Sequence, residues 1–164
     1  MATENYFTNY GSSPGFGEKT EPGSNAQEVV QAVATTEVAV ADDNGSTYLL
    51  FKSVPSSFRL VELTVMCDAI TGGTDYDIGV YNAETGVVVD KDLFMDGQTL
   101  ATASRALNGL GNVNIADIGA LKTIAELLGL TPTTAKSSYD IVLTGNTVGT
   151  AAGTVTAVLK GFSS

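Results

Sequence analysis

The alternation of apolar and polar residues in residues 58–89 constrains the fold more strongly than any other feature of this sequence. Along residues 58–67 the pattern has a period of two, which is typical of a pleated strand with at least one buried face. Shorter alternating runs follow at residues 76–80 and 87–89, and a glycine-containing turn precedes each of them. We therefore predict three consecutive antiparallel strands that form a meander. One face of the first strand is predicted to carry Arg59, Val61, Leu63, Val65 and Cys67.

Strand signals continue on both sides of this stretch. Residues 26–41 and 47–52 are separated by the sequence Asp-Asp-Asn-Gly at residues 42–45, and an Asn-Gly pair between two strands favours a type I′ hairpin. Near the end of the chain, residues 139–144 and 154–160 show strand patterns and are separated by a long turn rich in small residues. We expect both pairs to be strands.

One segment has the pattern of a helix. Asn114 offers an N-cap, and Asp117 follows three positions later, which resembles a capping box. Gly129 fits the C′ position, and Pro132 prevents further extension. A helix of this length is marginal alone, so its apolar stripe must pack on the sheets. The stripe consists of Ile118, Leu121, Ile124, Ala125 and Leu128.

Together these signals predict a mainly β protein. Seven to nine short strands and one short α-helix are typical of an antiparallel β-sandwich, of jelly-roll type in our interpretation. Residues 99–108 fit either a short strand or a helical turn. A length of 164 residues suits one domain with a sizeable core, which we place at residues 29–164.

Residues 1–28 differ from the rest and are predicted to form an extended N-terminal arm. Glycine and proline interrupt the segment, and it has neither a helical nor a strand period. Its four aromatic residues are unusual for a solvated linker, because such linkers are poor in aromatics. The arm either lies on its own domain or docks on a neighbouring subunit, and in the second case these aromatic residues are the partner-binding residues. They are Tyr6, Phe7, Tyr10 and Phe16.

Charge excludes several classes of partner. The net charge is −10, and the eight basic residues form no stripe or arm, so we expect neither nucleic acid nor anionic membrane as a partner. No run approaches the roughly 18 apolar residues of a membrane span. The first residues do not have the pattern of a signal peptide, and we expect assembly in the cytoplasm of a host cell.

Reaction chemistry is not visible in the sequence. The chain has no histidine, which removes the usual base of a serine or cysteine nucleophile and the imidazole ligands of metal sites. Cys67 is predicted to be a small buried hydrophobe. We therefore predict no enzyme activity, no catalytic residues, no cofactor and no metal site.

Two acidic groupings were weighed as sites. Asp75 and Asp77 are two positions apart, so on a strand both would point to one face. A second group resembles a calcium loop only loosely and does not match the EF-hand pattern. We expect these carboxylates to lie in solvated turns and hairpin tips. The second group consists of Asp90, Asp92 and Asp96.

The order of several plain motifs resembles a group of small proteins of tailed bacteriophages and prophages. The similarity covers roughly residues 45–160, and it leaves the N-terminal arm outside. Its main elements are the run DAITGGTDYDIGVY at residues 68–81, residues 89–97, the AELLG sequence at 125–129, and residues 139–153. Such proteins are encoded among head genes beside the major capsid protein. The resemblance implies a virion structural role, chiefly that of a capsid decoration or cement protein, and it supplies no catalytic residues.

From the resemblance we expect a protein of the outer capsid surface that bridges subunits of the major capsid protein. We expect it to associate with itself as a homotrimer, with a dimer as the second arrangement. The alternative hypothesis is a carbohydrate-binding or adhesive β-sandwich on a virion or cell surface. Its candidate contacts are Tyr76, Tyr81 and Asp75 or Asp77.

Overall fold

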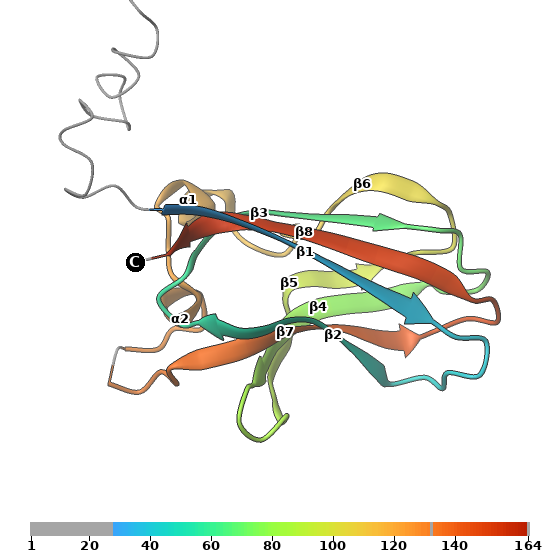
Figure 1. The fold of residues 1–164 in the computed structure, drawn as a ribbon, viewed down its shortest axis with the longest axis horizontal. Helices are drawn as coiled ribbons and strands as arrows, with labels where there is room; N and C mark the ends of the chain where they lie inside the picture. Colours follow the sequence, from blue (N-terminus) through green and yellow to red (C-terminus); the bar gives the residue numbers. More distant parts are fainter. Residues whose placement is uncertain (1–27, 132, 164) are drawn as a thin grey trace, which may run out of the picture.

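The computed structural model describes residues 28–131 and 133–163, which form a sandwich of two four-stranded antiparallel sheets (Figure 1). The prediction of an antiparallel β-sandwich is thereby confirmed. The first sheet contains, in spatial order, β1 (Glu28–Val38), β8 (Gly153–Ser163), β3 (Arg59–Cys67) and β6 (Ser104–Asn108). The second sheet contains β2 (Ser46–Pro55), β7 (Ser138–Thr147), β4 (Asp75–Asn82) and β5 (Val88–Gln98).

The pairing of the strands is that of a jelly roll. β1 pairs with β8, β2 with β7, β3 with β6 and β4 with β5, so the chain resembles one long hairpin that has been rolled up. Rolling places alternate pairs in opposite sheets, and the β4–β5 link is the one connection between consecutive described strands that stays within a sheet. The apolar faces of both sheets then meet in a single core.

Two predicted local pairings are wrong. β3 lies in the first sheet and β4 in the second, so residues 58–89 do not form a meander. Likewise β1 and β2 lie in different sheets and form no hairpin, although Gly45 has the positive φ of 90° that its turn signal indicates. Turn residues make the chain reverse, but burial on both sheets decides whether it returns to the same sheet or crosses to the other.

A bulge in β3 changes which residues face the core. Leu60 is opposite Gly161 and Glu62 is opposite Lys160, so Val61 is an extra residue in the ladder. The side chain of Val61 is therefore exposed, while Leu60 is buried. The prediction of a strand with at least one buried face is confirmed, since Leu63, Val65 and Cys67 are buried together, but Val61, which we placed on the same face, is exposed.

The predicted helix is two short helices, α1 (Ile115–Gly119) and α2 (Ile124–Leu127). Asn114 caps α1 as expected, since its side chain accepts from the Ala116 N–H at 2.9 Å. The chain then turns at Leu121, whose φ is 52°, and a second cap forms at Thr123. The break is tertiary in origin, because the N–H of Ile124 donates to the carbonyl of Phe58 rather than to a helical partner.

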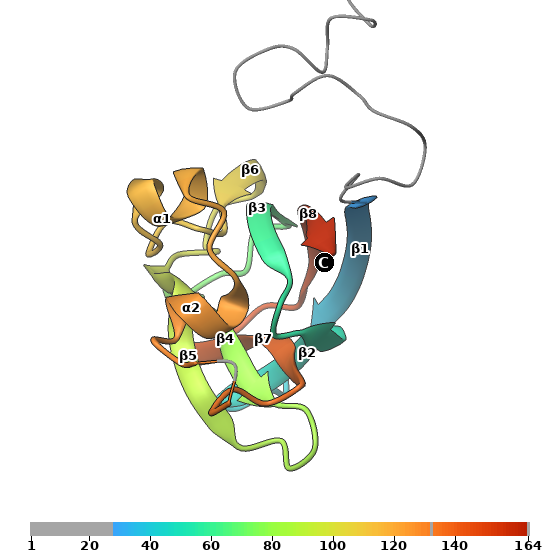
Figure 2. The same ribbon diagram turned by 90° about the vertical axis from the view of Figure 1, so that its left-hand side faces the viewer.

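The details of the caps differ from the prediction. The capping box consists of Thr123 and Glu126, whereas Asp117 forms an ion pair with Lys122 at 2.7 Å. Gly129 occupies the C′ position after α2 with a φ of 68°, as predicted. Together the helices close one end of the sandwich (Figure 2).

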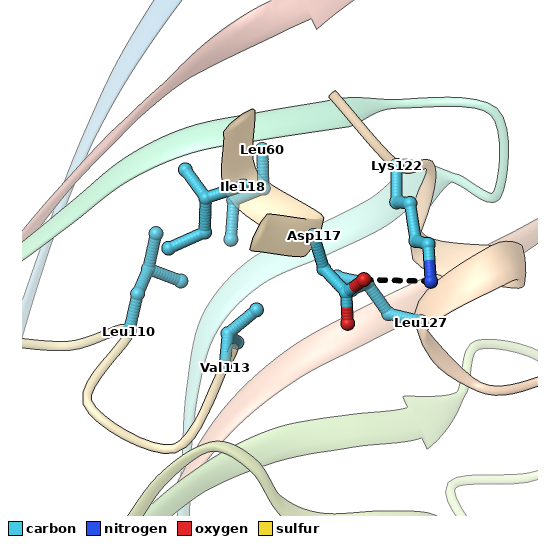
Figure 3. A pocket seen from close by; sticks show the side chains of 7 residues that line it. All are labelled: Leu60, Leu110, Val113, Asp117, Ile118, Lys122 and Leu127. Atoms are coloured by element: carbon cyan, nitrogen blue, oxygen red, sulfur yellow. Dashed lines mark ion pairs between the residues drawn. The ribbon is translucent and has the colours of Figure 1, made fainter. Parts of the chain in front are cut away.

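Beneath α1 the closure is tight. Figure 3 shows the apolar side chains of this end and the ion pair at its rim, and the space between them leaves no room for a water molecule. The core is therefore tightly packed at this end of the sandwich. The apolar residues that line it are Leu60, Leu110, Val113, Ile118 and Leu127.

Candidate functional site

Reactive groups are not gathered into a catalytic cluster in the described part of the chain. No group of three or more Cys, Asp or Glu residues within residues 28–131 and 133–163 is arranged to hold a metal ion. Cys67 is buried, as predicted, and its thiol donates weakly to the carbonyl of Thr102 at 3.7 Å. Burial raises the pKa of the Cys67 thiol, so the reactive thiolate is disfavoured. Two other features remain as candidate sites, a polar network on β4 and an apolar groove beside β1.

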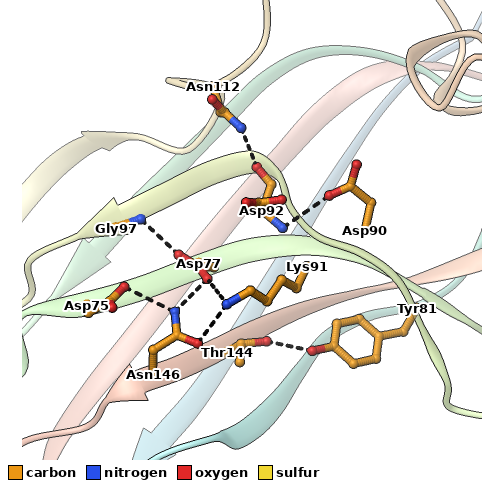
Figure 4. A network of polar contacts seen from close by, with 10 residues as sticks. All are labelled: Asp75, Asp77, Tyr81, Asp90, Lys91, Asp92, Gly97, Asn112, Thr144 and Asn146. Atoms are coloured by element: carbon orange, nitrogen blue, oxygen red, sulfur yellow. Dashed lines mark hydrogen bonds and ion pairs between the residues drawn. The ribbon is translucent and has the colours of Figure 1, made fainter.

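The polar network is centred on the carboxylate of Asp77 (Figure 4). Asp77 is 1% exposed and accepts hydrogen bonds from the Gly97 N–H at 2.8 Å and the Asn146 side-chain amide at 2.6 Å. The ammonium nitrogen of Lys91 lies 3.2 Å from the Oδ2 atom of Asp77, the oxygen that also accepts from Asn146. Gly97 and Lys91 belong to β5 and Asn146 belongs to β7, so the network ties β4 to both of its neighbouring strands.

A large bulge in β5 brings Lys91 to this position. Ile78 is opposite Met95, whereas Val80 is opposite Asp90, so β5 has three more residues than β4 between these two pairs. The extra chain passes over Gly79, where a Cβ atom would meet the carbonyl oxygen of Asp90 at 2.0 Å. Gly79 therefore permits the close crossing that places Lys91 above Asp77.

The protonation state of Asp77 follows from these contacts. Burial alone raises the pKa of a carboxyl, but here the donors outweigh it: the Gly97 N–H, the Asn146 amide and the Lys91 ammonium together lower the pKa of Asp77. A carboxylate that is ionised and fully hydrogen-bonded is a poor general acid or base. The network is built to hold strands together.

The structure confirms one expectation about these aspartates and corrects another. Asp75 and Asp77 do share a face, since the amide of Asn146 donates to both, at 3.1 Å to Asp75. The expectation of a solvated carboxylate is wrong for Asp77, because β5 and Asn146 cover it. A sequence pattern of alternating Asp residues could not reveal this cover, since Lys91 and Asn146 are distant along the chain.

The second acidic grouping is a local feature of β5. The N–H of Asp92 donates weakly to the side chain of Asp90 at 3.4 Å, and the carbonyl of Asp92 accepts from the Asn112 amide at 2.7 Å. Burial, followed by the neighbouring Asp92 side chain, raises the pKa of Asp90. Asp96 is exposed.

The candidate contacts of the carbohydrate hypothesis are mostly inaccessible. Tyr76 is fully buried, and its hydroxyl donates to the carbonyl of Val148 at 2.8 Å. Tyr81 is partly buried and its hydroxyl is hydrogen-bonded to Thr144 at 2.7 Å. Tyr76 and Asp77 are therefore wrong as surface contacts.

An apolar groove of about 350 Å³ lies on the opposite side, between β1 and β2. Its walls come from both sheets, because β1 contributes Val30 and Ala32 and β2 contributes most of the remainder. Small side chains on the inward face of β1 leave this space open. The other apolar lining includes Leu50, Phe51, Val54, Phe58 and Leu159.

The outer edge of β1 is regular, and no other strand of the described residues pairs with it. β1 is at the end of its sheet, and its pairing with β8 runs without a register shift over eleven residues. Val29 and Val33 are 66% and 61% exposed. An uninterrupted edge with exposed apolar side chains is a template for pairing with another segment of chain. The sequence analysis did not identify this edge, because its alternation reads the same for an edge strand and a central one.

The predicted partner-binding residues Tyr6, Phe7, Tyr10 and Phe16 lie outside the described residues, as does most of the predicted arm. Their role stays a prediction. The described chain begins at residue 28, the first residue of β1, and Val30 and Ala32 of this strand line the groove.

Comparisons with known proteins do not assign this chain to a family. No protein-family model matches the sequence. No curated protein matches it. A solved structure to which the chain is similar is a chain of the cyanophage Pam1 capsid asymmetric unit, with 14% sequence identity and a TM-score of 0.47 over 88% of this chain and 92% of that chain. The jelly-roll assignment rests on the strand pairing described above and not on this likeness.

Proposed function

We propose that this protein is a structural component of a tailed-phage virion that decorates the capsid and stabilises it by bridging subunits of the major capsid protein. The sequence resemblance over residues 45–160 supports this role, as does an architecture that viral capsid domains commonly use. The observation that carries the proposal is the edge of β1, which pairs with no further strand in residues 28–131 and 133–163 and can therefore pair with a neighbouring protein.

The edge of β1 has the properties of a docking strand. Its outward N–H and C=O groups can continue the sheet into a neighbouring chain, and main-chain pairing of this kind supplies affinity with little demand on sequence. Val29 and Val33 on the exposed face add apolar contact beside it. Several such contacts act together when a decoration protein binds a symmetric shell.

The N-terminal segment supplies a second contact in this proposal. Burial of one Phe or Tyr contributes roughly 1.5–3 kcal/mol, and ordering one residue costs about 1–2 kcal/mol, so a cluster of aromatic anchors can hold a docked segment. The segment contains four, Tyr6, Phe7, Tyr10 and Phe16. Bound copies associate as a homotrimer, with a dimer as the second arrangement. A net charge of −10 suits the outer face, away from packaged DNA.

Binding to particles tests the proposal. Virions that lack this protein are mixed with the purified chain, and bound copies are measured by sedimentation and located by electron microscopy. We expect saturable binding on the outside of the head, and weaker binding after deletion of residues 1–20. Failure of the full-length chain to bind such particles would overturn the capsid role.

A matched pair of substitutions tests the β1 edge in the same assay. Val33 and Val87 are equally exposed, at 61% and 62%, but Val87 lies in the β4–β5 hairpin. Val33→Lys should weaken particle binding by about tenfold or more, because a charge would be buried in the contact. Val87→Lys should leave binding within about twofold. Equal effects of the two changes would count against β1 as the contact.

A further inference from the structure

We propose that the groove between β1 and β2 receives one large apolar side chain from an extended segment of the major capsid protein, while the backbone of that segment pairs with the outer edge of β1. A carboxylate of the same segment pairs with Lys52 at the groove. The inference rests on the proposed binding to the capsid, and it specifies the chemistry of the segment that binds and the placement of its side chains.

The geometry of β1 calls for an extended partner. No described strand pairs with its outer side, while its inner side pairs with β8 without a register shift over eleven residues. Residues that lie opposite each other on paired strands point to the same face of a sheet. Val30 and Ala32 pack against the core and line the groove, so partner residues opposite them also point between the two sheets. An added strand therefore brings alternate side chains to the groove.

The groove selects a large apolar side chain. Its walls are core side chains, since Leu50, Phe51 and Val54 are each 7% exposed and Phe58 is 3% exposed. The helices leave no such space at the end of the sandwich that they close, whereas about 350 Å³ stays open between β1 and β2. A leucine, methionine or phenylalanine side chain that enters from the added strand removes this apolar surface from water.

A second copy of this chain does not supply such a side chain. In two fully overlapped β1 strands related by a twofold axis, residues whose numbers sum to 66 lie opposite each other. Val30 and Ala32 would then be opposite Thr36 and Ala34 of the second copy. These side chains are too small to occupy the groove. The edge of β1 and the groove together therefore fit a different protein better than they fit a symmetric dimer.

Charge at the groove specifies the polar part of the segment. Lys52 lies at the groove, is exposed, and makes no ion pair with any residue that the structure describes. On an extended segment, residues two positions apart share a face and are about 7 Å apart. A carboxylate two positions from the inserted apolar residue therefore lies within reach of the flexible Lys52 side chain. The segment that fits carries a large apolar residue and an acidic residue at this spacing.

Filling the groove tests the insertion in the particle-binding assay. Ala32→Leu should weaken binding by about tenfold or more, because the added methyl groups take the place of the inserted side chain while the outer backbone edge is unchanged. The Tm of the isolated protein should stay the same or rise, because these groups enter open apolar space. Gln31→Leu is the control, since its side chain is exposed on the other face of β1, and it should keep binding within about twofold.

The outcomes separate this inference from the capsid role. If the wild type and Ala32→Leu bind particles equally, the insertion is wrong and the capsid role stands. If the wild type does not bind, both are wrong. A large fall in the Tm of Ala32→Leu would show that the groove has no room for a side chain, and it would also overturn the insertion.

A pair of charge reversals tests the contact of Lys52. Lys52→Glu should weaken particle binding by about threefold or more at low salt, and the loss should shrink as salt is added. Arg105→Glu is the matched control and should keep binding within about twofold. Arg105 is also exposed and without an ion pair among the described residues, but it lies on β6 at the opposite edge of the sheet. Equal losses for the two reversals would overturn the contact.

Zero-length cross-linking identifies the occupant. A carbodiimide couples the amine of Lys52 to a carboxylate in direct contact with it, and mass spectrometry of particles saturated with the wild-type protein locates the amide. The expected product joins Lys52 to an Asp or Glu of the major capsid protein, two positions from a large apolar residue. A link from Lys52 only to this chain, whether within one copy or between copies, would overturn the proposal. The absence of any link at Lys52 would overturn the predicted ion pair.

Discussion

The two open sides of the sandwich differ in how far their edge strands are hindered from pairing with another chain. On one side lie the edge strands β5 and β6, and on the other lie β1 and β2 (Figure 2). β5 has three register shifts and carries Asp90, Lys91 and Asp92, while β6 has five residues and one register shift. Such devices prevent edge-to-edge association.

On the other side, only one of the two edge strands has features that hinder pairing with another chain. β2 is interrupted by two register shifts, by Ser53 with a φ of 52°, and by Pro55. β1 beside it has none of these, and it borders an apolar groove. The edges at β5, β6 and β2 therefore carry features that hinder pairing with another strand, whereas the edge at β1 carries none of them in the described residues.

Gly79→Ala, on the side of β5 and β6, should lower the free energy of unfolding more than any other change proposed here. A methyl group there would meet backbone atoms of Asp90 and Lys91 at 2.0–2.5 Å, so the β5 bulge must move. We expect the free energy of unfolding to fall by about 3 kcal/mol or more, measured by urea denaturation. Gly119→Ala is the control, since that position has open space, and it should change stability by less than about 1 kcal/mol. A stable Gly79→Ala protein would contradict the close crossing.

Asp77→Ala should have the next largest effect. It leaves the Gly97 N–H and the Asn146 amide without their acceptor in a covered site, and it removes the partner of Lys91. We expect a loss of about 2–3 kcal/mol in the same measurement. Asp75→Ala removes one hydrogen bond at a partly exposed position and should cost less than about 1 kcal/mol. Equal losses would show that the network is not centred on Asp77.

Acid should weaken the same network. The folded-state pKa of Asp77 lies below its ordinary value of 3.8, so its stabilising effect is complete above that value. The effect is lost as the pH falls from about 3.8 through the lower folded pKa. Urea denaturation at a series of pH values from 5 to 2 should show a shallower decline for Asp77→Asn than for the wild type. Identical slopes would show that Asp77 is not the group that titrates.

Asp90→Asn should raise the free energy of unfolding slightly, whereas Asp77→Ala should lower it. Burial and the adjacent Asp92 raise the pKa of Asp90 in the folded state, so its stabilising contribution is present at low pH and is lost as the pH rises through that pKa. At pH 7 the neutral amide should therefore raise the free energy of unfolding by about 0.5 kcal/mol. Asp96→Asn, at an exposed position, should change it less. A destabilised Asp90→Asn protein would mean that the carboxylate is needed as an acceptor.

Substitution of an exposed valine on β1 should have the smallest effect on stability. Val33→Lys and Val87→Lys alter equally exposed side chains, so both should leave the free energy of unfolding within about 0.5 kcal/mol of wild type. Thermal and urea unfolding of the isolated proteins check this. A large loss for Val33→Lys alone would mean that β1 is already covered in the free molecule, and the contrast between the two sides would then disappear.

Local sequence patterns were sufficient to predict most of the strands and the helix caps. Alternation located the strands around residues 58–67, 139–144 and 154–160, because the side-chain period of a strand depends on the backbone alone. Asn114 and Gly129 marked helix ends correctly for the same reason, since caps are contacts between near neighbours in the chain.

Features that depend on residues distant along the chain could not be predicted from these local patterns. The sheet that each strand joins, the outward turn of Val61, the break at Leu121 and the burial of Asp77 are all set by what packs across from them. Local chemistry is nearly the same for a hairpin and for a crossing between sheets. The two differ in the apolar surface that the completed core buries, and that surface exists only after both sheets have come together.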